Sequence, residues 1–205
     1  MPPKPSKSEY LLTDTGNKVS RRNQIHGSQN IILGGRTVIQ AEVCIRGDLI
    51  RTTIPSNSSS SSSSSTSTSS KPSTSSAPAA QNNVAVSIGR YTFLSAGSIL
   101  HPPSKTHRGI FSYYPLKIGD NVYIGRGSVI EAAVIGSNVW IGEGCVVGNM
   151  AILRDGVKVL DGTVVSAGMV IPSGVVVGGR PGRIVGELGM GWEGVDGRTL
   201  WKNVG

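Results

Sequence analysis

The chain has little of what stabilises most globular domains. Of its 205 residues only two are Phe and three are Trp, and 16% are charged, against about 25% in ordinary globular domains. Its two cysteines, Cys44 and Cys145, lie far apart and form no C-x-x-C pair. The sequence therefore predicts neither a disulfide framework nor a zinc ribbon. We expect both cysteines to be small, reduced core residues.

Long apolar runs are also absent. No stretch approaches the roughly 18 uninterrupted apolar residues of a membrane span, and the start, MPPKPSKSEY, lacks the apolar stretch of a signal peptide. We therefore expect a soluble intracellular protein without direct membrane insertion. The net charge of +8 invites a nucleic-acid partner, but the basic residues are dispersed and are not interleaved with aromatics. We interpret the charge as solvated surface and expect no nucleic-acid partner.

Glycine is abundant, at 28 residues, and aliphatic residues, here called anchors, recur at every sixth position. The longest series of anchors is Ile135, Ile141, Val147, Leu153, Val159, Val165, Ile171 and Val177. Upstream series are Ile118, Ile124 and Ile130, then Ile88, Leu94 and Leu100, then Leu33, Ile39 and Ile45. A helix would return apolar residues at three or four positions and an exposed strand at two. A period of six instead predicts an all-β protein, a parallel β-helix of hexapeptide repeats.

Three hexads make one triangular coil, so the anchors predict about six to seven coils, with Val19 and Ile25 in the first. A small or β-branched residue, such as Val134 or Cys145, follows most anchors by four positions. A one-residue deletion near residues 132–134 brings two of the series into register. Glycine often follows the anchor directly, and we expect it to supply the positive φ that tight corners need.

The repeat divides the chain into an N-terminal arm (1–17), a β-helix domain (18–183) and a C-terminal tail (184–205). Two interruptions are expected in the β-helix. The first is a Ser-rich insert (55–83), whose composition predicts a disordered loop that either accepts phosphate or has no task of its own. The second is a protruding loop (101–115).

The protruding loop carries Phe111, Tyr113 and Tyr114. Aromatic residues concentrated in a loop suit a contact surface for a partner, but they also suit local cover for the side of the prism. We predict these three as partner-binding residues and keep both alternatives open.

The C-terminal region carries two further expectations. A short helix from Arg183 to Leu188 would cover the last coil, because a solenoid must cap its open strand edge. Trp192 and Trp201, in an otherwise Gly-rich tail, indicate docking, either onto the prism or onto a partner.

One segment resembles the γ-class carbonic anhydrases. In that pattern an Arg-x-Asp element, here Arg46-Gly47-Asp48, precedes a coil that ends in a zinc-binding His, here His101. Arg126 and Glu131 stand where the pattern has two further His ligands, and a protonated guanidinium offers no lone pair to zinc.

Other catalytic arrangements are equally weak. An acyltransferase of this fold would need a His as general base, and neither His26 nor His107 is a convincing candidate. We therefore predict no enzyme, with no catalytic, cofactor-binding or metal-binding residues. A zinc enzyme of the carbonic anhydrase type and a hexapeptide acyltransferase remain the alternatives.

Several segments resemble one family of scaffold subunits, the β-helical subunits at the pointed end of dynactin. The matching segments are SEYLLTDTGNKVSR (8–21), GSQNIILGGRTVI (27–39), CIRGDL (44–49), PLKIGDNVYI (115–124) and GRPGRIVGEL (179–188). The resemblance implies a left-handed β-helix without enzymatic activity, a structural and adaptor subunit of the pointed-end complex.

The same resemblance implies partners and a location. They are a second β-helical subunit (dynactin subunit 6), the actin-related cap and other pointed-end subunits, and indirectly dynein and endosomal cargo. The implied role is support of dynein-driven transport of early endosomes along microtubules, in the cytoplasm and at the cytoskeleton. The insert and the tail depart from this family, which leaves the cargo and the tail's partner open.

Overall fold

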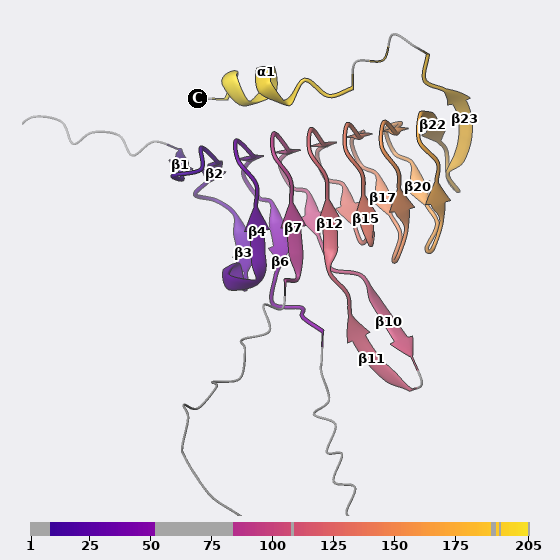
Figure 1. Ribbon diagram of the computed structural model, residues 1–205, viewed down its shortest axis with the longest axis horizontal. Helices are drawn as coiled ribbons and strands as arrows, with labels where there is room; N and C mark the ends of the chain where they lie inside the picture. Colours follow the sequence, from indigo (N-terminus) through magenta and orange to yellow (C-terminus); the bar gives the residue numbers. More distant parts are fainter. Residues whose placement is uncertain (1–8, 52–83, 108, 190–191, 193, 205) are drawn as a thin grey trace, which may run out of the picture.

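A computed structural model of the chain describes residues 9–51, 84–107, 109–189, 192 and 194–204. In these residues the chain winds into a three-sided, left-handed prism of short parallel strands (Figure 1). The fold class is therefore the all-β parallel β-helix that the hexads predict. The Ser-rich insert (55–83) lies outside the described residues.

Each side of the prism is one sheet, and each coil contributes one strand to each sheet. Sheet 1 contains, in spatial order, β1 (Tyr10–Leu12), β2 (Lys18–Ser20), β5 (Val38–Ile39), β8 (Phe93–Leu94), β13 (Tyr123–Ile124), β16 (Trp140–Ile141), β19 (Lys158–Val159), β22 (Val175–Gly178) and β23 (Arg183–Glu187). Sheet 2 contains β3 (Gln24–His26), β6 (Cys44–Arg46), β9 (Ile99–Leu100), β14 (Val129–Ile130), β17 (Val146–Val147) and β20 (Val164–Val165). Sheet 3 contains β4 (Ile31–Leu33), β7 (Val86–Ile88), β12 (Leu116–Ile118), β15 (Val134–Ile135), β18 (Ile152–Leu153) and β21 (Val170–Ile171).

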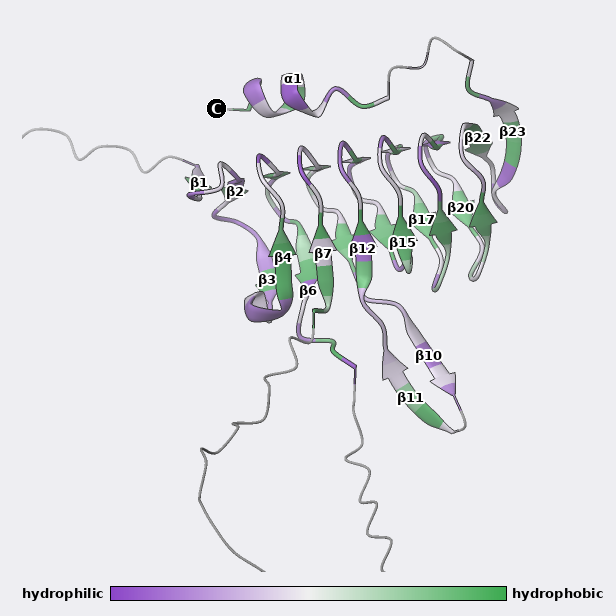
Figure 2. Cartoon of the chain, in the orientation of Figure 1, coloured by the Kyte–Doolittle hydropathy of each residue, from purple (hydrophilic) through white to green (hydrophobic). Residues whose placement is uncertain are grey.

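The first coil is thus β2, β3 and β4, and the sixth is β19, β20 and β21, after which β22 begins a seventh. Two antiparallel strands, β1 and β23, flank this winding. Four further elements lie outside it: the 3-10 helix η1 (Ser28–Asn30), the antiparallel pair β10 (Ser104–His107) and β11 (Ile110–Tyr113), and the helix α1 (Gly197–Lys202). Figure 2 shows apolar strands joined by more polar corners.

The anchors fill the interior of the prism. Every predicted anchor is at most 4% exposed, except in the first coil, where Val19 and Leu33 are half-buried and Ile25 is 36% exposed. Anchors face their equivalents in the next coil, because Ile118 pairs with Ile135 and Ile124 with Ile141 in the parallel ladders. The result is one continuous aliphatic core along the prism axis.

The residue four positions after the anchor also faces inward at most corners, as Cys145 does at 0% exposure. Val134 is the exception: its side chain is 38% exposed, and Ala132, at 0%, is the buried residue at that corner. The cause is the one-residue deletion, which shortens the corner and shifts Val134 to the position directly before an anchor, where side chains point outward.

The glycine after an anchor serves a different purpose from the one we expected. Gly125 does not adopt a positive φ; a Cβ atom there would collide with the carbonyl group of Gly142 in the next coil. The positive φ falls two residues later, at Gly127 (φ 63) or at a residue such as Asn121 (φ 55). The first glycine therefore permits close approach of successive coils, and the second position makes the turn.

The helix predicted from Arg183 to Leu188 is wrong. Residues Arg183–Glu187 form β23, which pairs antiparallel with β22. The edge of β22 offers unpaired backbone groups, and a strand satisfies them directly whereas a helix would not. At the opposite end β1 pairs antiparallel with β2 in the same way.

The cysteines are free thiols in different surroundings. Cys145 is buried in the core, and burial raises the pKa of its thiol. Cys44 is only half-buried, next to the inward-facing anchor Ile45 in β6, so the expectation of a core residue is wrong for Cys44. Among the described residues, no helix is long and apolar enough to cross a bilayer.

Candidate functional site

Both interruptions of the repeat leave the prism at the same corner, between sheet 2 and sheet 3. The insert connects β6 to β7, and the β10–β11 hairpin connects β9 to β12, one coil further along (Figure 1). We call this edge of the second and third coils the insertion corner. Both segments that depart from the regular repeat, the insert and the hairpin, leave the prism there.

The hairpin projects from the prism (Figure 1). Its second strand, β11, carries Phe111 and Tyr113. Its register pairs Ser104 with Tyr113 and Thr106 with Phe111. The Phe111 side chain is 53% exposed, and its ring centroid lies 5.1 Å from that of Tyr113 in an edge-to-face contact. Tyr113 in turn lies 5.9 Å from the ring of His101 at the hairpin root. The structure therefore joins two of the three predicted aromatics in one cluster.

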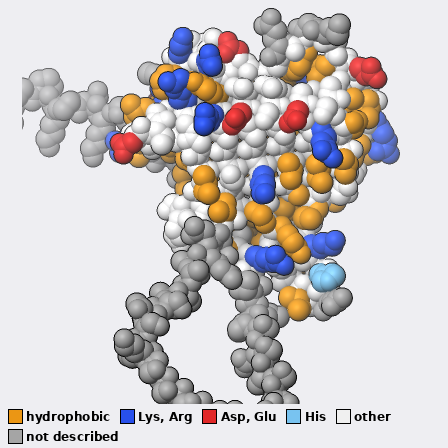
Figure 3. All heavy atoms as spheres, viewed as in Figure 1, with side chains coloured by type: hydrophobic (Ala, Val, Ile, Leu, Met, Phe, Trp, Pro, Cys, Tyr) orange, Lys and Arg blue, Asp and Glu red, His pale blue; other side chains and the backbone are white. Residues whose placement is uncertain are grey.

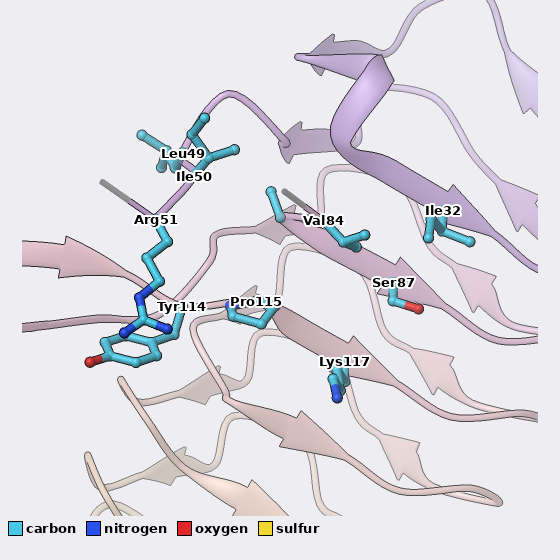
Figure 4. A pocket seen from close by; sticks show the side chains of 10 residues that line it. Ile32, Leu49, Ile50, Arg51, Val84, Ser87, Tyr114, Pro115 and Lys117 are labelled. Atoms are coloured by element: carbon cyan, nitrogen blue, oxygen red, sulfur yellow. The ribbon is translucent and has the colours of Figure 1, made fainter. Parts of the chain in front are cut away.

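The third aromatic, Tyr114, faces a different group. The guanidinium carbon of Arg51 lies 5.6 Å from the Tyr114 ring centroid (Figure 4). The two side chains flank a cavity of about 390 Å³ beside the outer face of sheet 3. Its lining is mainly apolar with two cations: Ile32, Leu49, Ile50, Val84, Pro115, Arg51 and Lys117, among others.

Apolar side chains also lie on the outside of sheet 3, where Figure 3 shows them gathered above the hairpin. Ile32 is 52% exposed and Val170 is 56% exposed, at opposite ends of the sheet. No Asp or Glu occurs between His101 and Ile118, whereas Lys105 and Lys117 do. The hairpin segment itself is thus aromatic, aliphatic and basic.

Asn149 fastens the hairpin root and was not identified from the sequence. The Ser104 backbone N–H donates to Asn149 Oδ1 at 2.8 Å, and Asn149 Nδ2 donates to the Ser104 carbonyl at 2.7 Å. The Tyr114 N–H donates to the Pro103 carbonyl at 2.7 Å and closes the root. Ser104 and Asn149 are 45 residues apart, so no local pattern connects them.

The residues of the carbonic anhydrase pattern lie at two corners of the prism. His101 follows β9 and Glu131 follows β14, so the two occupy the same corner of adjacent coils. Arg126 follows β13 at another corner and is exposed. In the described part of the chain, no group of three or more His, Cys, Asp or Glu side chains is placed to hold a metal ion.

The two remaining histidines also lie apart from each other. His26 ends β3 at the first coil and is exposed. His107 ends β10, where it pairs with Ile110 next to the hairpin turn. The structure therefore does not bring His107 back toward the prism.

The Arg-x-Asp element forms a paired group on the surface. Arg46 Nε and a terminal guanidinium nitrogen donate to the two carboxylate oxygens of Asp48, both at 2.8 Å. These hydrogen bonds lower the pKa of the Asp48 carboxyl from 3.8 to about 2. His26 pairs with Arg46 in the β3–β6 ladder. The Arg46 guanidinium is thus paired with the Asp48 carboxylate.

Among solved structures, the chain resembles the hexapeptide transferase family protein from Anaplasma phagocytophilum. The TM-score is 0.52 at 17% identity, covering 85% of this chain and 80% of that one. At this identity the resemblance shows the shared fold alone.

The sequence comparisons are more specific. A curated relative, dynactin subunit 5 of Dictyostelium discoideum, is 34% identical over 131 residues, which is 64% of this chain and 49% of that protein. The match thus spans about half the length of that relative. The family model described as Dynactin subunit 5 matches residues 4–74 and 79–193. Because these ranges include most of the prism and the hairpin, the chain belongs to the dynactin subunit 5 family.

Proposed function

We propose that the chain is a non-enzymatic structural and adaptor subunit of the dynactin pointed-end complex. It would support dynein-driven transport of cargo such as early endosomes along microtubules, in the cytoplasm and at the cytoskeleton. Family membership supports a role in dynactin. The domain division proposed for this role is an arm (1–17), a β-helix (18–183) and a tail (184–205).

The observation that carries the proposal is the projecting aromatic hairpin. Phe111 is 53% exposed, although burial of an aromatic side chain is favourable in free energy. Aromatic side chains surrounded by polar groups supply much of the affinity at protein interfaces. We assign partner contact to Phe111, Tyr113 and Tyr114.

The proposed partners are the second β-helical subunit (dynactin subunit 6), the actin-related cap and the other pointed-end subunits. One end of the prism suits stacking on another β-helix. Within the described chain β3 pairs only with β6, and Ile25 on β3 is 36% exposed. At the other end, by contrast, the anchors Ile171 and Val177 are fully buried. An incoming parallel strand would satisfy the open edge and cover Ile25.

The hairpin assignment is tested with a triple variant of the full chain, Phe111→Ser, Tyr113→Ser and Tyr114→Ser. We expect weaker co-purification of dynactin subunits from cell extract with an unchanged circular dichroism spectrum, because the hairpin stands outside the core. A matched control, Ile184→Ser with Val185→Ser, removes exposed apolar area from β23, where these residues are 50% and 60% exposed.

Two results would contradict the assignment: unchanged co-purification of the triple variant, or an equal loss in the β23 control. The non-enzymatic part is tested separately on the purified wild-type chain. Hydration of carbon dioxide, or transfer of an acyl group from an acyl-thioester, would contradict it.

A further inference from the structure

The C-terminal tail returns along the whole prism. Figure 1 shows it leaving β23 and running back to the end where β1 and β2 lie. Its contacts descend through the coils: Trp192 lies over Lys158 of the sixth coil, at 5.1 Å from ring centroid to ammonium. Gly194 then lies beside Asn138, which precedes the fifth coil. We call Trp192 and residues 194–204 the strap.

The middle of the strap packs closely on the third coil. Gly197 is buried, and a Cβ atom there would collide with the carbonyl oxygen of Tyr91. Val195 is 5% exposed. Leu200 lies with Phe93 and other residues around a hollow of about 290 Å³ on the outside of sheet 1. This part of the tail is therefore seated on the prism.

The strap ends in a latch on the first coil. The Trp201 Nε1–H donates to the Gly16 carbonyl at 2.8 Å. Lys18 Nζ donates to the Trp201 carbonyl at 2.9 Å and to that of Val204, and it lies 4.4 Å from the Trp201 ring centroid. The Lys18 cation thus satisfies carbonyls at the C-terminus of α1, the end of a helix that favours positive charge.

The first coil needs such support. Its inward-facing residues Val19, Ile31 and Leu33 are only partly buried, Ile25 is exposed, and the buried hydrophobic core begins at Val38. In a solenoid each coil contacts only its neighbours, so a terminal coil with little apolar burial opens at low free-energy cost. A six-residue helix such as α1 is itself too short to be stable alone. The strap and the first coil therefore depend on each other.

We propose that the strap is an intramolecular latch that holds the first coil folded, through the contacts of Trp201 with Gly16 and Lys18. The strap links the last coil of the solenoid to the first, so opening of the first coil requires release of the tail. Because β3 belongs to this coil, the latch also keeps β3, the edge strand of sheet 2, folded. This inference concerns the chain alone and does not depend on the proposed function.

Amide hydrogen exchange of the full chain tests the latch. The Gln24 N–H donates to the Val43 carbonyl and reports the first coil, whereas the Gly142 N–H donates to the Val159 carbonyl and reports the fifth. In Trp201→Ala we expect exchange at Gln24 to rise about tenfold or more, with Gly142 unchanged. Lys18→Met, which breaks the latch from the other side, should give the same pattern.

The control is Lys202→Ala, an exposed residue of the same helix, which should leave both amides unchanged. The proposal is overturned if Gln24 exchanges at its wild-type rate in both latch variants. It is equally overturned if Gln24 and Gly142 accelerate together, because the variants would then act on the whole prism.

Discussion

An anchor inside the prism faces its equivalents in the coils on either side, so one side chain contributes to two coil interfaces. Ile141, for example, pairs with Ile124 before it and Val159 after it. The sequence predicts this inward position, because every anchor occupies the same place in its six-residue repeat. The reason for glycine after the anchor could not be predicted from local sequence. A Cβ atom at Gly125 would collide with the carbonyl group of Gly142, which belongs to the next coil.

The first prediction compares an anchor with an outward-facing residue. Ile141→Ala should lower the free energy of unfolding by about 2–5 kcal/mol, because it leaves a cavity in the close-packed core. Val170→Thr, at a side chain 56% exposed, should change it by less than about 0.5 kcal/mol. Urea unfolding followed by circular dichroism measures both. Equal destabilisation of the two variants would contradict the assignment of inward and outward faces.

The second prediction concerns the Asp48 carboxyl, whose pKa the Arg46 hydrogen bonds lower to about 2. Because the folded-state pKa lies below the usual 3.8, the pair stabilises the fold above about pH 4. This stabilisation is lost as the pH falls toward 2. Both side chains are more than a third exposed, so the effect on unfolding is small, and an NMR titration of the carboxyl carbon is the appropriate measurement. Arg46→Gln should return the pKa toward 3.8; an unchanged pKa would show that Arg46 is not the cause.

At the scale of elements, most strands of the coils are two or three residues long, and their stability comes from stacking on neighbours. Local sequence predicted these strands through their anchors, but it gave the wrong element for Arg183–Glu187. The strand β23 pairs with β22. Residues 183–187 form a strand because the edge of β22 offers backbone groups that only another strand can pair with. The position of Asn149 at the hairpin root depends in the same way on a contact 45 residues away.

The third prediction tests this root. Asn149→Ala removes two hydrogen bonds to Ser104, each with a net contribution of about 0.5–1.5 kcal/mol. We expect faster amide exchange at Tyr114, whose N–H closes the root, and unchanged exchange at Gly148, whose N–H donates to Val165 in the core.

Asn149→Asp is the matched variant for this prediction, because it keeps an oxygen acceptor for the Ser104 N–H but turns a carboxylate oxygen, which cannot donate, toward the Ser104 carbonyl. It should therefore also accelerate exchange at Tyr114. Equal acceleration at Gly148 in either variant would show that Asn149 supports the coil and not the hairpin.

At the scale of the molecule, the insertion corner follows from counting anchors. The insert comes after Ile45 and the hairpin after Leu100, and three anchors separate a position from its equivalent one coil later. The anchor count therefore places the two interruptions at the same corner of adjacent coils. Docking of Trp192 and Trp201 onto the prism is one of the two alternatives that the sequence leaves open, and the contacts of both side chains with the prism confirm it. The course of the strap could not be predicted, because the contact between Trp201 and Gly16 joins residues 185 apart.

We propose that the prism docks onto other subunits within dynactin. The most direct measurement is affinity purification of the tagged full chain from cells under native conditions, followed by size separation and mass spectrometry of the fractions. We predict that the chain elutes in a large complex with other dynactin subunits, and that the Ser variants of Phe111, Tyr113 and Tyr114 reduce this fraction. Elution of the wild-type chain as a free 21.3 kDa protein, or only with copies of itself, would contradict the claim.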